Sequence, residues 1–335
     1  KGLLKKATRL FLSQSKPRFL NIAAAKINNE QTGNRVSTQF LDLTTVKLLD
    51  TTARDAHQSL VNSQGIDYQF GIKTAQLAGD VHLKSLANGG AGLRGFEAGG
   101  GMMPDACART LGLNYWWWIY QVSEHLPDDI PLQILLRSQS ANGYRPFADD
   151  IIEANIKAHV IAGDGHPIRG RVFDALNSVS NSISTYKAAQ KHGMETEGMY
   201  CYNVNKDGSL DIKTAVAFIR DSIEMGADGI GIKDMAGLMT PEHAYLLGYE
   251  FRLAAGPKMN ISCHTHMTSH MAPATYVMFI KGNLDAGGGP ISIDGSISSF
   301  SGGPAQPALE TLAMMLKPMD VLGPNLETKD FSEYA

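Results

Sequence analysis

The sequence predicts an α/β protein that folds as a (β/α)8 TIM barrel with an N-terminal extension. Two observations carry this prediction: short β-rich runs alternate eight times with longer helix-like stretches, and most of the runs end in polar residues. The chain has 335 residues, and a barrel of this class needs about 250, so the length allows one barrel with extensions. An open sheet of six or seven strands is the alternative.

The predicted elements alternate from about residue 45 onward. Strands are expected at 46–50, 92–98, 131–137, 168–175, 198–204, 226–234, 261–266 and 290–297. The clearest helices between them are expected at 149–162, 178–192, 211–225 and 241–255. Strands that are linked through helices pair in parallel, which is the arrangement that closes a barrel.

Polar residues gather at the carboxyl ends of the expected strands. This end of a parallel barrel holds the active site. Packing of the core does not explain why so many strands end in charged residues. The distribution therefore predicts an enzyme. The residues are Asp50 to Asp55, Glu97, Arg137, Asp174, Lys233 with Asp234, His264 with His266, and Asp294.

Residues 1–40 are expected to form a basic extension ahead of a barrel domain that comprises residues 41–335. Residues 1–29 carry seven lysines and arginines, and the first acidic residue is Glu30. A basic, amphipathic and acid-poor segment is typical of a mitochondrial transit peptide, which favours the mitochondrial matrix. The alternative is an ordinary basic surface helix in a cytoplasmic protein.

Composition excludes several classes of protein. The chain is 43% hydrophobic and 19% charged, as in ordinary globular domains, and its net charge of −3 argues against bulk attraction to nucleic acid. No apolar run approaches the roughly 20 residues that span a bilayer. Cys107, Cys201 and Cys263 are widely spaced and form no CxxC pair, which indicates a reducing compartment.

His264 and His266 suggest a metal site. Side chains alternate along a strand, so both imidazoles point to the same side, toward the barrel mouth. Two imidazoles favour Zn²⁺, Co²⁺ or Mn²⁺ over Mg²⁺, and Asp55 can bring a carboxylate to the same mouth. The alternative is two polar residues that merely close a strand.

Lys233 ends the sixth expected strand, where a lysine is either paired with a carboxylate or functional. A structural ion pair with Asp234 or Asp174 is the alternative to a functional role.

Four further residues are candidates for substrate binding. Arg54 can fork onto a substrate carboxylate, and Gln58 in the same loop can donate to a keto oxygen. Arg137 and Tyr144 belong to another mouth loop, where a second cation suits an acidic substrate. The alternatives are an ordinary charged loop and a salt bridge at the barrel end.

Two other patterns have plainer interpretations. The triple glycines at 99–101 and 287–289 fit no phosphate-binding spacing and are expected to be loops. The three tryptophans at 116–118 are expected on a helix that packs outside the barrel or at an interface.

Several motifs resemble one family closely. The likeness covers about residues 46 to 315 and is to the carboxyltransferase domain of pyruvate carboxylase and to the free-standing subunits of transcarboxylase and oxaloacetate decarboxylase. The order and spacing of RDAHQS, KDMAGL and HTH are highly specific to this family. The motifs are LLDTTARDAHQSL (48–60), QILLRSQSANGYRPFADD (133–150), RVFDALN (171–177), GIKDMAGLMTP (231–241), SCHTHMTSH (262–270) and SGGPAQPALETL (301–312).

The resemblance implies roles for the candidate residues. It implies that a divalent metal is held by Asp55, His264, His266 and a carbamylated Lys233. It also implies that a keto acid and the biotin carboxylate are bound by Arg54, Gln58, Arg137 and Tyr144, with Lys233 and Arg54 acting in catalysis.

The reaction that the resemblance implies is biotin-dependent carboxyl transfer. Carboxybiotin loses CO₂, pyruvate gives up a methyl proton, and the enolate, stabilised by the metal and Arg54, attacks CO₂ to give oxaloacetate. The reverse direction decarboxylates oxaloacetate. The sequence has no AMKM-type biotinyl motif, so a biotin carrier protein is the expected partner, together with a biotin carboxylase. A homo-oligomer is also expected.

The chain departs from the family at several positions. Pro304 replaces a threonine that is thought to move the proton between biotin and pyruvate, and Met267 and His270 stand where the family reads HTHDTSG. Gly99 replaces a tryptophan, 102–104 read MMP, and VNSQG follows RDAHQSL. These departures leave two alternatives: a metal-dependent lyase or acyl-CoA synthase that needs no biotin, and a catalytically decayed assembly subunit.

Overall fold

The structure, a computed structural model, describes residues 44–61, 66–141 and 143–334. The extension predicted for residues 1–40 lies outside this part of the chain, so its helix and its proposed role in targeting stay predictions.

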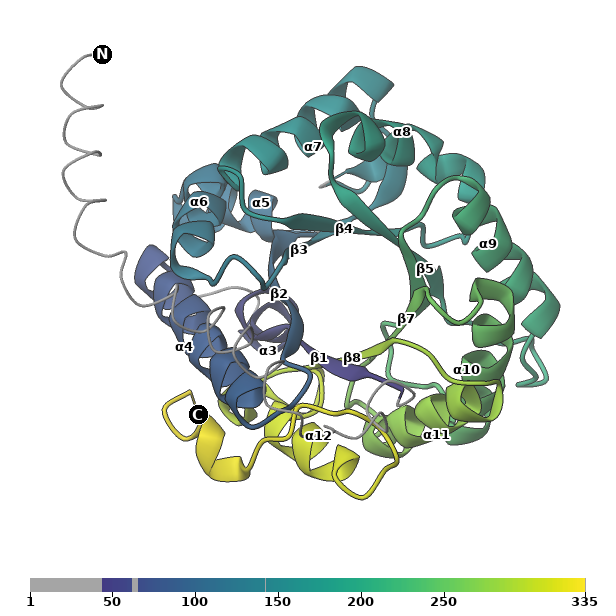
Figure 1. Cartoon of the computed structure of the whole chain (residues 1–335). Coiled ribbons are helices and arrows are strands. Elements are labelled where there is room, and N and C mark those ends of the chain that lie inside the picture. Colours follow the sequence, from purple (N-terminus) through teal and green to yellow (C-terminus); the bar gives the residue numbers. More distant parts are fainter. Residues whose placement is uncertain (1–43, 62–65, 142, 335) are drawn as a thin grey trace, which may run out of the picture. The chain divides into compact units, whose positions relative to one another are not determined.

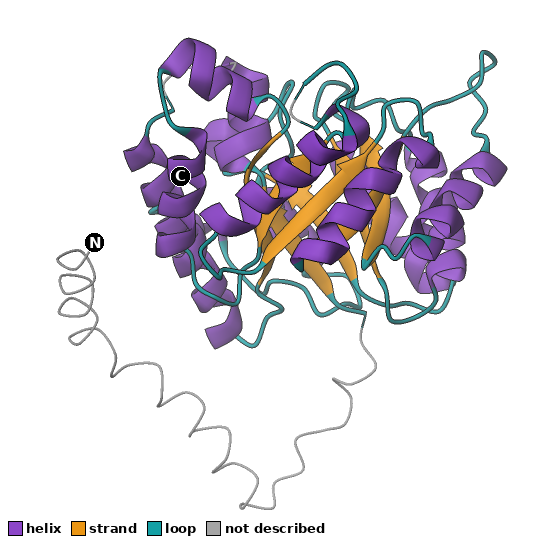
Figure 2. Cartoon of the chain, turned by 90° about the horizontal axis from the view of Figure 1, so that it is seen from above, coloured by secondary structure: helices purple, strands orange, loops and turns teal. Residues whose placement is uncertain are grey.

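Eight parallel strands form a closed barrel in which each strand pairs with its neighbours in the chain and β8 pairs with β1 (Figure 1). This confirms the predicted fold and excludes the open sheet. Figure 2 shows the strands inside a layer of helices. The strands are β1 Val46–Asp50, β2 Leu93–Gly100, β3 Leu132–Leu136, β4 Ile168–Phe173, β5 Glu195–Cys201, β6 Gly229–Asp234, β7 Asn260–Thr265 and β8 Ile291–Gly295.

The helices surround the barrel, and several begin at side-chain caps that the sequence supplies. Asp67, Asn114, Asp211 and Thr240 each accept hydrogen bonds from backbone N–H groups of the first helical turn, which otherwise have no partner. The α-helices are α3 His57–Val61, α4 Tyr68–Ala87, α5 Met103–Ala106, α6 Tyr115–His125, α7 Asp149–Ala162, α8 Ile183–His192, α9 Ile212–Glu224, α10 Pro241–Ala255, α11 Ala272–Asp285 and α12 Leu309–Leu316.

Helices α10 and α11 approach each other through a pair of glycines. A Cβ on Gly248 would collide with the carbonyl oxygen of Phe279, and a Cβ on Gly282 with that of Tyr245. The missing side chains therefore let the two backbones meet directly. This contact fixes the helices that lie outside β6 and β7, the strands that carry Lys233 and the paired histidines.

The glycine and tryptophan predictions are partly right. Gly287–Gly289 lie between α11 and β8, as expected, but Gly99 and Gly100 end strand β2 rather than forming a loop. The tryptophans lie on α6, where Trp118 is buried and donates to the Ala98 carbonyl, whereas Trp116 and Trp117 are exposed. Their role at an interface stays a prediction.

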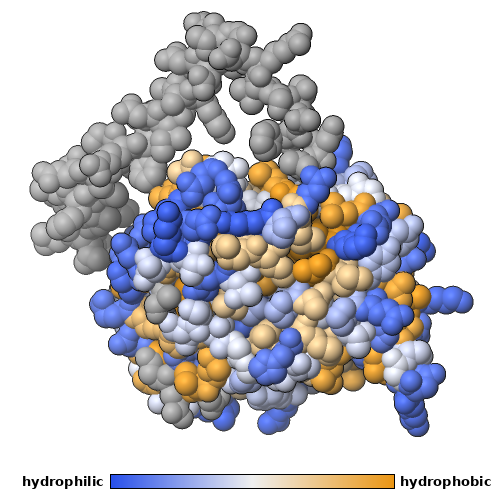
Figure 3. All heavy atoms as spheres, turned by 90° about the horizontal axis from the view of Figure 1, so that it is seen from below, coloured by the Kyte–Doolittle hydropathy of each residue, from blue (hydrophilic) through white to orange (hydrophobic). Residues whose placement is uncertain are grey.

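The surface and the cysteines agree with the composition. No helix in the described part of the chain is long and apolar enough to cross a bilayer. The face in Figure 3 mixes hydrophilic and hydrophobic side chains. All three cysteines are buried free thiols.

The barrel interior holds charged groups where most barrels hold branched aliphatic side chains. Arg171 on β4 contacts Asp294 on β8, and because these strands are not neighbours the contact crosses the interior. A small apolar cluster, separate from the main core, lines another part: Leu135, Phe173, Met199 and Cys201.

Candidate metal centre

Three buried side chains converge at the carboxyl end of the barrel. His264 and His266 point the same way along the end of β7, and their Nε2 atoms are 3.1 Å apart. Asp55 lies in a short π-helical turn after β1, and its Oδ2 is 3.2 Å from His264 Nε2 and 3.5 Å from His266 Nε2. One carboxylate and two imidazoles therefore face a common point.

These distances fit a metal ion. Ligands that sit about 2.0–2.1 Å from one tetrahedral zinc are about 3.3 Å from each other. The three contacts between the ligand atoms run from 3.1 to 3.5 Å. Imidazole nitrogen with carboxylate oxygen also suits Co²⁺ and Mn²⁺. The residues present thus match the group that the sequence suggests.

Each imidazole is oriented by a partner on its far nitrogen. His264 Nδ1 donates to Asp294 Oδ2 at 2.7 Å, and His266 Nδ1 donates to the Pro304 carbonyl at 2.5 Å. Both Nε2 atoms are then left as lone-pair acceptors that face Asp55. Burial lowers the pKa of His266 to about 4, which keeps this ring neutral. A cation satisfies such a convergence of acceptors.

Lys233 completes the group from β6. Its Nζ is 3.0 Å from His264 Nε2, and the side chain is buried beside the Phe173 ring. Burial lowers its pKa. The alternative of an ion pair is wrong: Asp234 and Asp174 accept from the backbone of their own loops, and neither contacts Lys233 among the described residues.

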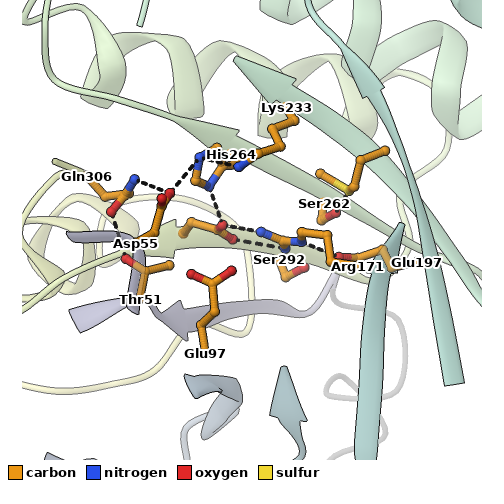
Figure 4. A network of polar contacts seen from close by, with 12 residues as sticks. Thr51, Asp55, Glu97, Arg171, Glu197, Lys233, Ser262, His264, Ser292 and Gln306 are labelled. Atoms are coloured by element: carbon orange, nitrogen blue, oxygen red, sulfur yellow. Dashed lines mark hydrogen bonds and ion pairs between the residues drawn. The ribbon is translucent and has the colours of Figure 1, made fainter. Parts of the chain in front are cut away.

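Two carboxylates flank Arg54 next to the metal ligands. Its Nη1 is 3.0 Å from Asp55 Oδ1, and its Nη2 is 2.7 Å from Glu97 Oε2. Burial would raise the pKa of Asp55, but the charges of Arg54 and Lys233 hold it well below its usual range. Burial raises the pKa of Glu97, whose oxygens accept no well-aligned hydrogen bond within the described chain (Figure 4).

Gln306 is a part of the site that sequence reasoning missed. Its Nε2 donates to Asp55 Oδ2 at 2.9 Å, and its Oε1 accepts from the Thr51 hydroxyl at 2.9 Å (Figure 4). The amide therefore holds the metal-facing oxygen of Asp55. The available signal was its position in SGGPAQP, beside the noted Pro304.

The expected substrate-binding residues form two groups. A Cβ on Gly101 would lie 3.3 Å from Arg54 Nη1 and 3.9 Å from Gln58 Oε1, so this glycine keeps the space between them open. Gln58 Oε1 is buried and has no hydrogen-bond partner in the described part of the chain. Arg137 instead lies 5.0 Å from the ring centre of Tyr144, which is 78% exposed.

Arg137 has no acidic partner among the described residues. Its Nη1 donates to Met102 Sδ at 3.2 Å and to the Gly143 carbonyl at 3.4 Å. The alternative of a salt bridge at the barrel end is therefore wrong. A cation without a counter-charge is suited to an anionic ligand.

The structure accounts for several departures from the family motifs. The space beside Gly99 is filled by the Tyr115 hydroxyl and Ile119. Pro304 is exposed and contributes only its carbonyl, to His266. His270 stands where the family has glycine, and its φ of 61° is a left-handed conformation that glycine adopts more readily.

Comparison with known proteins gives consistent relatives, although no protein-family model matches the chain. It is similar to a pyruvate carboxylase subunit of Methanocaldococcus jannaschii, with 36% identity over 81% of this chain and 44% of the relative. It is also similar to the methylmalonyl-CoA carboxyltransferase 5S subunit of Propionibacterium freudenreichii subsp. shermanii, with 29% identity over 81% of this chain and 49% of the relative. The chain thus spans about half the length of these curated relatives.

Solved structures give the same result. The carboxyl transferase domain of Rhizobium etli pyruvate carboxylase with oxamate and biotin matches with a TM-score of 0.75 and 28% identity, over 88% of this chain and 47% of that one. The same domain with pyruvate matches with a TM-score of 0.73 and 28% identity, over the same shares of the two chains.

Proposed function

This chain belongs to the carboxyltransferase family of pyruvate carboxylase and transcarboxylase, and we propose that it moves a carboxyl group between carboxybiotin and pyruvate through an enolate. The observation that carries the proposal is the convergence of Asp55, His264 and His266 beside Lys233 and Arg54. These side chains come from three separate parts of the barrel, namely the turn after β1, β6 and the end of β7, and packing alone does not explain why they converge.

The metal would be held by Asp55 Oδ2 and by Nε2 of His264 and His266, with Zn²⁺, Co²⁺ or Mn²⁺ as the candidates. Bound there, it supplies Lewis acidity to a developing enolate oxygen.

Lys233 is proposed as the fourth ligand after carbamylation. The neutral amine forms an N–C bond to CO₂ and loses a proton, which turns a cation into an anionic oxygen ligand. Burial lowers its pKa, and its Nζ lies 3.0 Å from His264 Nε2 with no carboxylate in hydrogen-bonding contact in the described chain, which supports this role.

The other residues bind substrate and exclude water. Arg54 is held between two carboxylates with its charge beside the reaction centre. Gln58, whose Oε1 has no partner in the described chain, would donate through its Nε2–H to a keto oxygen. Arg137, which has no acidic partner, attracts the substrate carboxylate, with Tyr144 beside it. The apolar cluster around Phe173 keeps the pocket dry, which strengthens each electrostatic contact.

The proposed step is balanced in atoms and charge. The N–CO₂ bond of carboxybiotin breaks, and biotin nitrogen takes up the proton that the pyruvate methyl group loses. A C–C bond then forms between the enolate carbon and CO₂ to give oxaloacetate. The same residues serve the reverse direction, oxaloacetate decarboxylation.

The partners follow from the relatives. We propose a biotin carrier and a biotin carboxylase as partners, pyruvate or oxaloacetate as substrate, and a homo-oligomeric assembly. The basic residues 1–29 support import into the mitochondrial matrix, with the cytoplasm as the alternative. Fusing residues 1–40 to a fluorescent protein and imaging it in cells tests this location.

Oxaloacetate decarboxylation tests the function directly. Purified protein with Zn²⁺ or Mn²⁺ receives oxaloacetate with and without free biotin, and lactate dehydrogenase reports the pyruvate formed. We expect a pyruvate rate that biotin stimulates, above a His264→Ala control in the same metal solution. Turnover that needs an acyl-CoA and ignores biotin would instead support a biotin-independent enzyme. No turnover until Pro304→Thr restores it would support a decayed subunit.

Metal analysis tests the ligand set independently of activity. Lys233→Ala and His264→Ala proteins, dialysed and reloaded, are measured by inductively coupled plasma mass spectrometry. We expect both to lose most of the metal held by the parent protein. Metal content unchanged by either substitution contradicts the proposed ligands.

A further inference from the structure

A buried chain of charged groups runs from the middle of the barrel to the metal centre. Arg171 donates through Nε to Glu197 at 2.9 Å (Figure 4). It also donates to both oxygens of Asp294, through Nη1 to Oδ2 and through Nη2 to Oδ1 at 3.2 Å. Asp294 Oδ2 in turn accepts from His264 Nδ1 at 2.7 Å. The three charged side chains are at most 1% exposed.

These buried charged groups are an unfavourable way to stabilise the fold. Burying charges costs free energy that a layer of aliphatic side chains avoids, and barrels of this class usually fill their interior with such layers. The contacts also leave Asp294 no freedom, because Arg171 occupies both of its oxygens. The orientation of the His264 ring therefore depends on a group that does not touch the metal site.

Arg169, two residues before Arg171, provides an internal comparison. Arg169 lies on the same strand and pairs through Nη2 with Glu195 of β5 at 3.0 Å, as Arg171 pairs with Glu197. Arg169 contacts no carboxylate of β8 in the described structure. The two arginines thus share residue type, strand and a glutamate partner on β5. They differ in the contact with Asp294 and in the exposure of that glutamate, which is 59% for Glu195 and 1% for Glu197.

We propose that Arg171 is a positioning residue for the metal centre: it fixes Asp294, which holds His264 with Nε2 toward Asp55. This inference rests on the proposed function, because it requires that His264 binds metal. Partners of this kind set the tautomer and basicity of a histidine ligand, and their loss typically weakens metal binding 10- to 100-fold.

Arg171→Met and Arg169→Met form the matched test in the full chain. Co²⁺ is titrated into each metal-free protein, and its visible d–d spectrum and dissociation constant are recorded with the thermal unfolding curve. We expect Arg171→Met to raise the dissociation constant at least about 10-fold and to alter the spectrum. Arg169→Met should keep both close to the parent values, even where it lowers the melting temperature. Arg171→Lys, which retains one donor, should give an intermediate affinity.

The outcomes separate this inference from the proposed function. Parent-like Co²⁺ affinity and spectrum in Arg171→Met overturn the positioning role while the metal site stands. Failure of the parent protein to bind Co²⁺, or equal binding by His264→Ala, overturns the metal site itself. If Arg171→Met does not fold, Asp294→Asn, which keeps the side-chain shape, tests the positioning role instead. We expect it to bind Co²⁺ at least about 10-fold more weakly, and parent-like binding refutes the inference.

Discussion

The individual residues of the site differ in whether they could be predicted from the sequence. Asp55, Lys233, His264 and His266 could be singled out because each lies at or just after the carboxyl end of an expected strand, and the structure brings them together. Metal binding by this set stays a prediction. Gln306 could not be assigned, because its contact with Asp55 joins positions 251 apart and exists only once the barrel closes.

Gln306 gives a prediction about the metal-facing oxygen of Asp55. Gln306→Leu removes the N–H that fixes Oδ2, so the carboxylate is free to rotate away from the metal. We expect the Co²⁺ dissociation constant to rise about 10-fold in a spectroscopic titration. Gln190→Leu, on the exterior helix α8, is the control and should bind as the parent does. Equal affinity in the two variants would remove Gln306 from the site.

Asp50 gives a prediction about pH. Burial raises its pKa from 3.8 to about 6, so the folded state holds this proton more tightly than the unfolded chain does. The stabilisation is therefore complete below pH 4 and is lost as the pH rises through 6. At about 1.4 kcal/mol per pKa unit, the change is about 3 kcal/mol. Asp50→Asn should gain stability relative to the parent over this interval, as measured by urea unfolding. A difference that does not vary with pH contradicts the prediction.

At the level of the elements, the sequence predicts location better than local geometry. The strand at 46–50 and the helices at 149–162 and 241–255 lie where alternation and periodicity place them. Other boundaries shift by a few residues, and β2 runs on into Gly99 and Gly100, whose lack of side chains gave no strand signal. The π-helical turn at 52–56, which directs Asp55 at the histidines, has no recognisable signature in the sequence.

The crossing of α10 and α11 yields a prediction at this scale. Gly248→Ala places a methyl group against the Phe279 carbonyl, so the two helices must separate. Overpacking of this kind outweighs the better helix propensity of alanine and should cost about 2 kcal/mol or more. Urea unfolding measures it, and Lys281→Ala, an exposed position of α11, should change the stability by less than about 0.5 kcal/mol. A stabilised Gly248→Ala protein would show that the contact is loose.

Across the whole barrel unit, metal binding and folding should be linked. The proposed ligands come from the turn after β1, from β6 and from the end of β7, and they exist as a set only in the folded state. Metal at 100 times its dissociation constant therefore adds about 2.7 kcal/mol to the stability, or a melting-temperature rise of about 4–5 °C for a barrel of this size. Differential scanning calorimetry with and without Zn²⁺ measures this. The same rise in His264→Ala would place the binding elsewhere.

The candidate metal centre draws on residues from both ends of the barrel sequence, which affects how the protein is made. Asp55 leaves the ribosome early, whereas Gln306, to which it is hydrogen-bonded, emerges 251 residues later. A stalled nascent chain that lacks β8 also lacks Asp294, so His264 has no counter-ion to hold it. If these residues bind the ion as proposed, full affinity requires that translation has passed β8 and Gln306, so metal uptake would report that the barrel is complete.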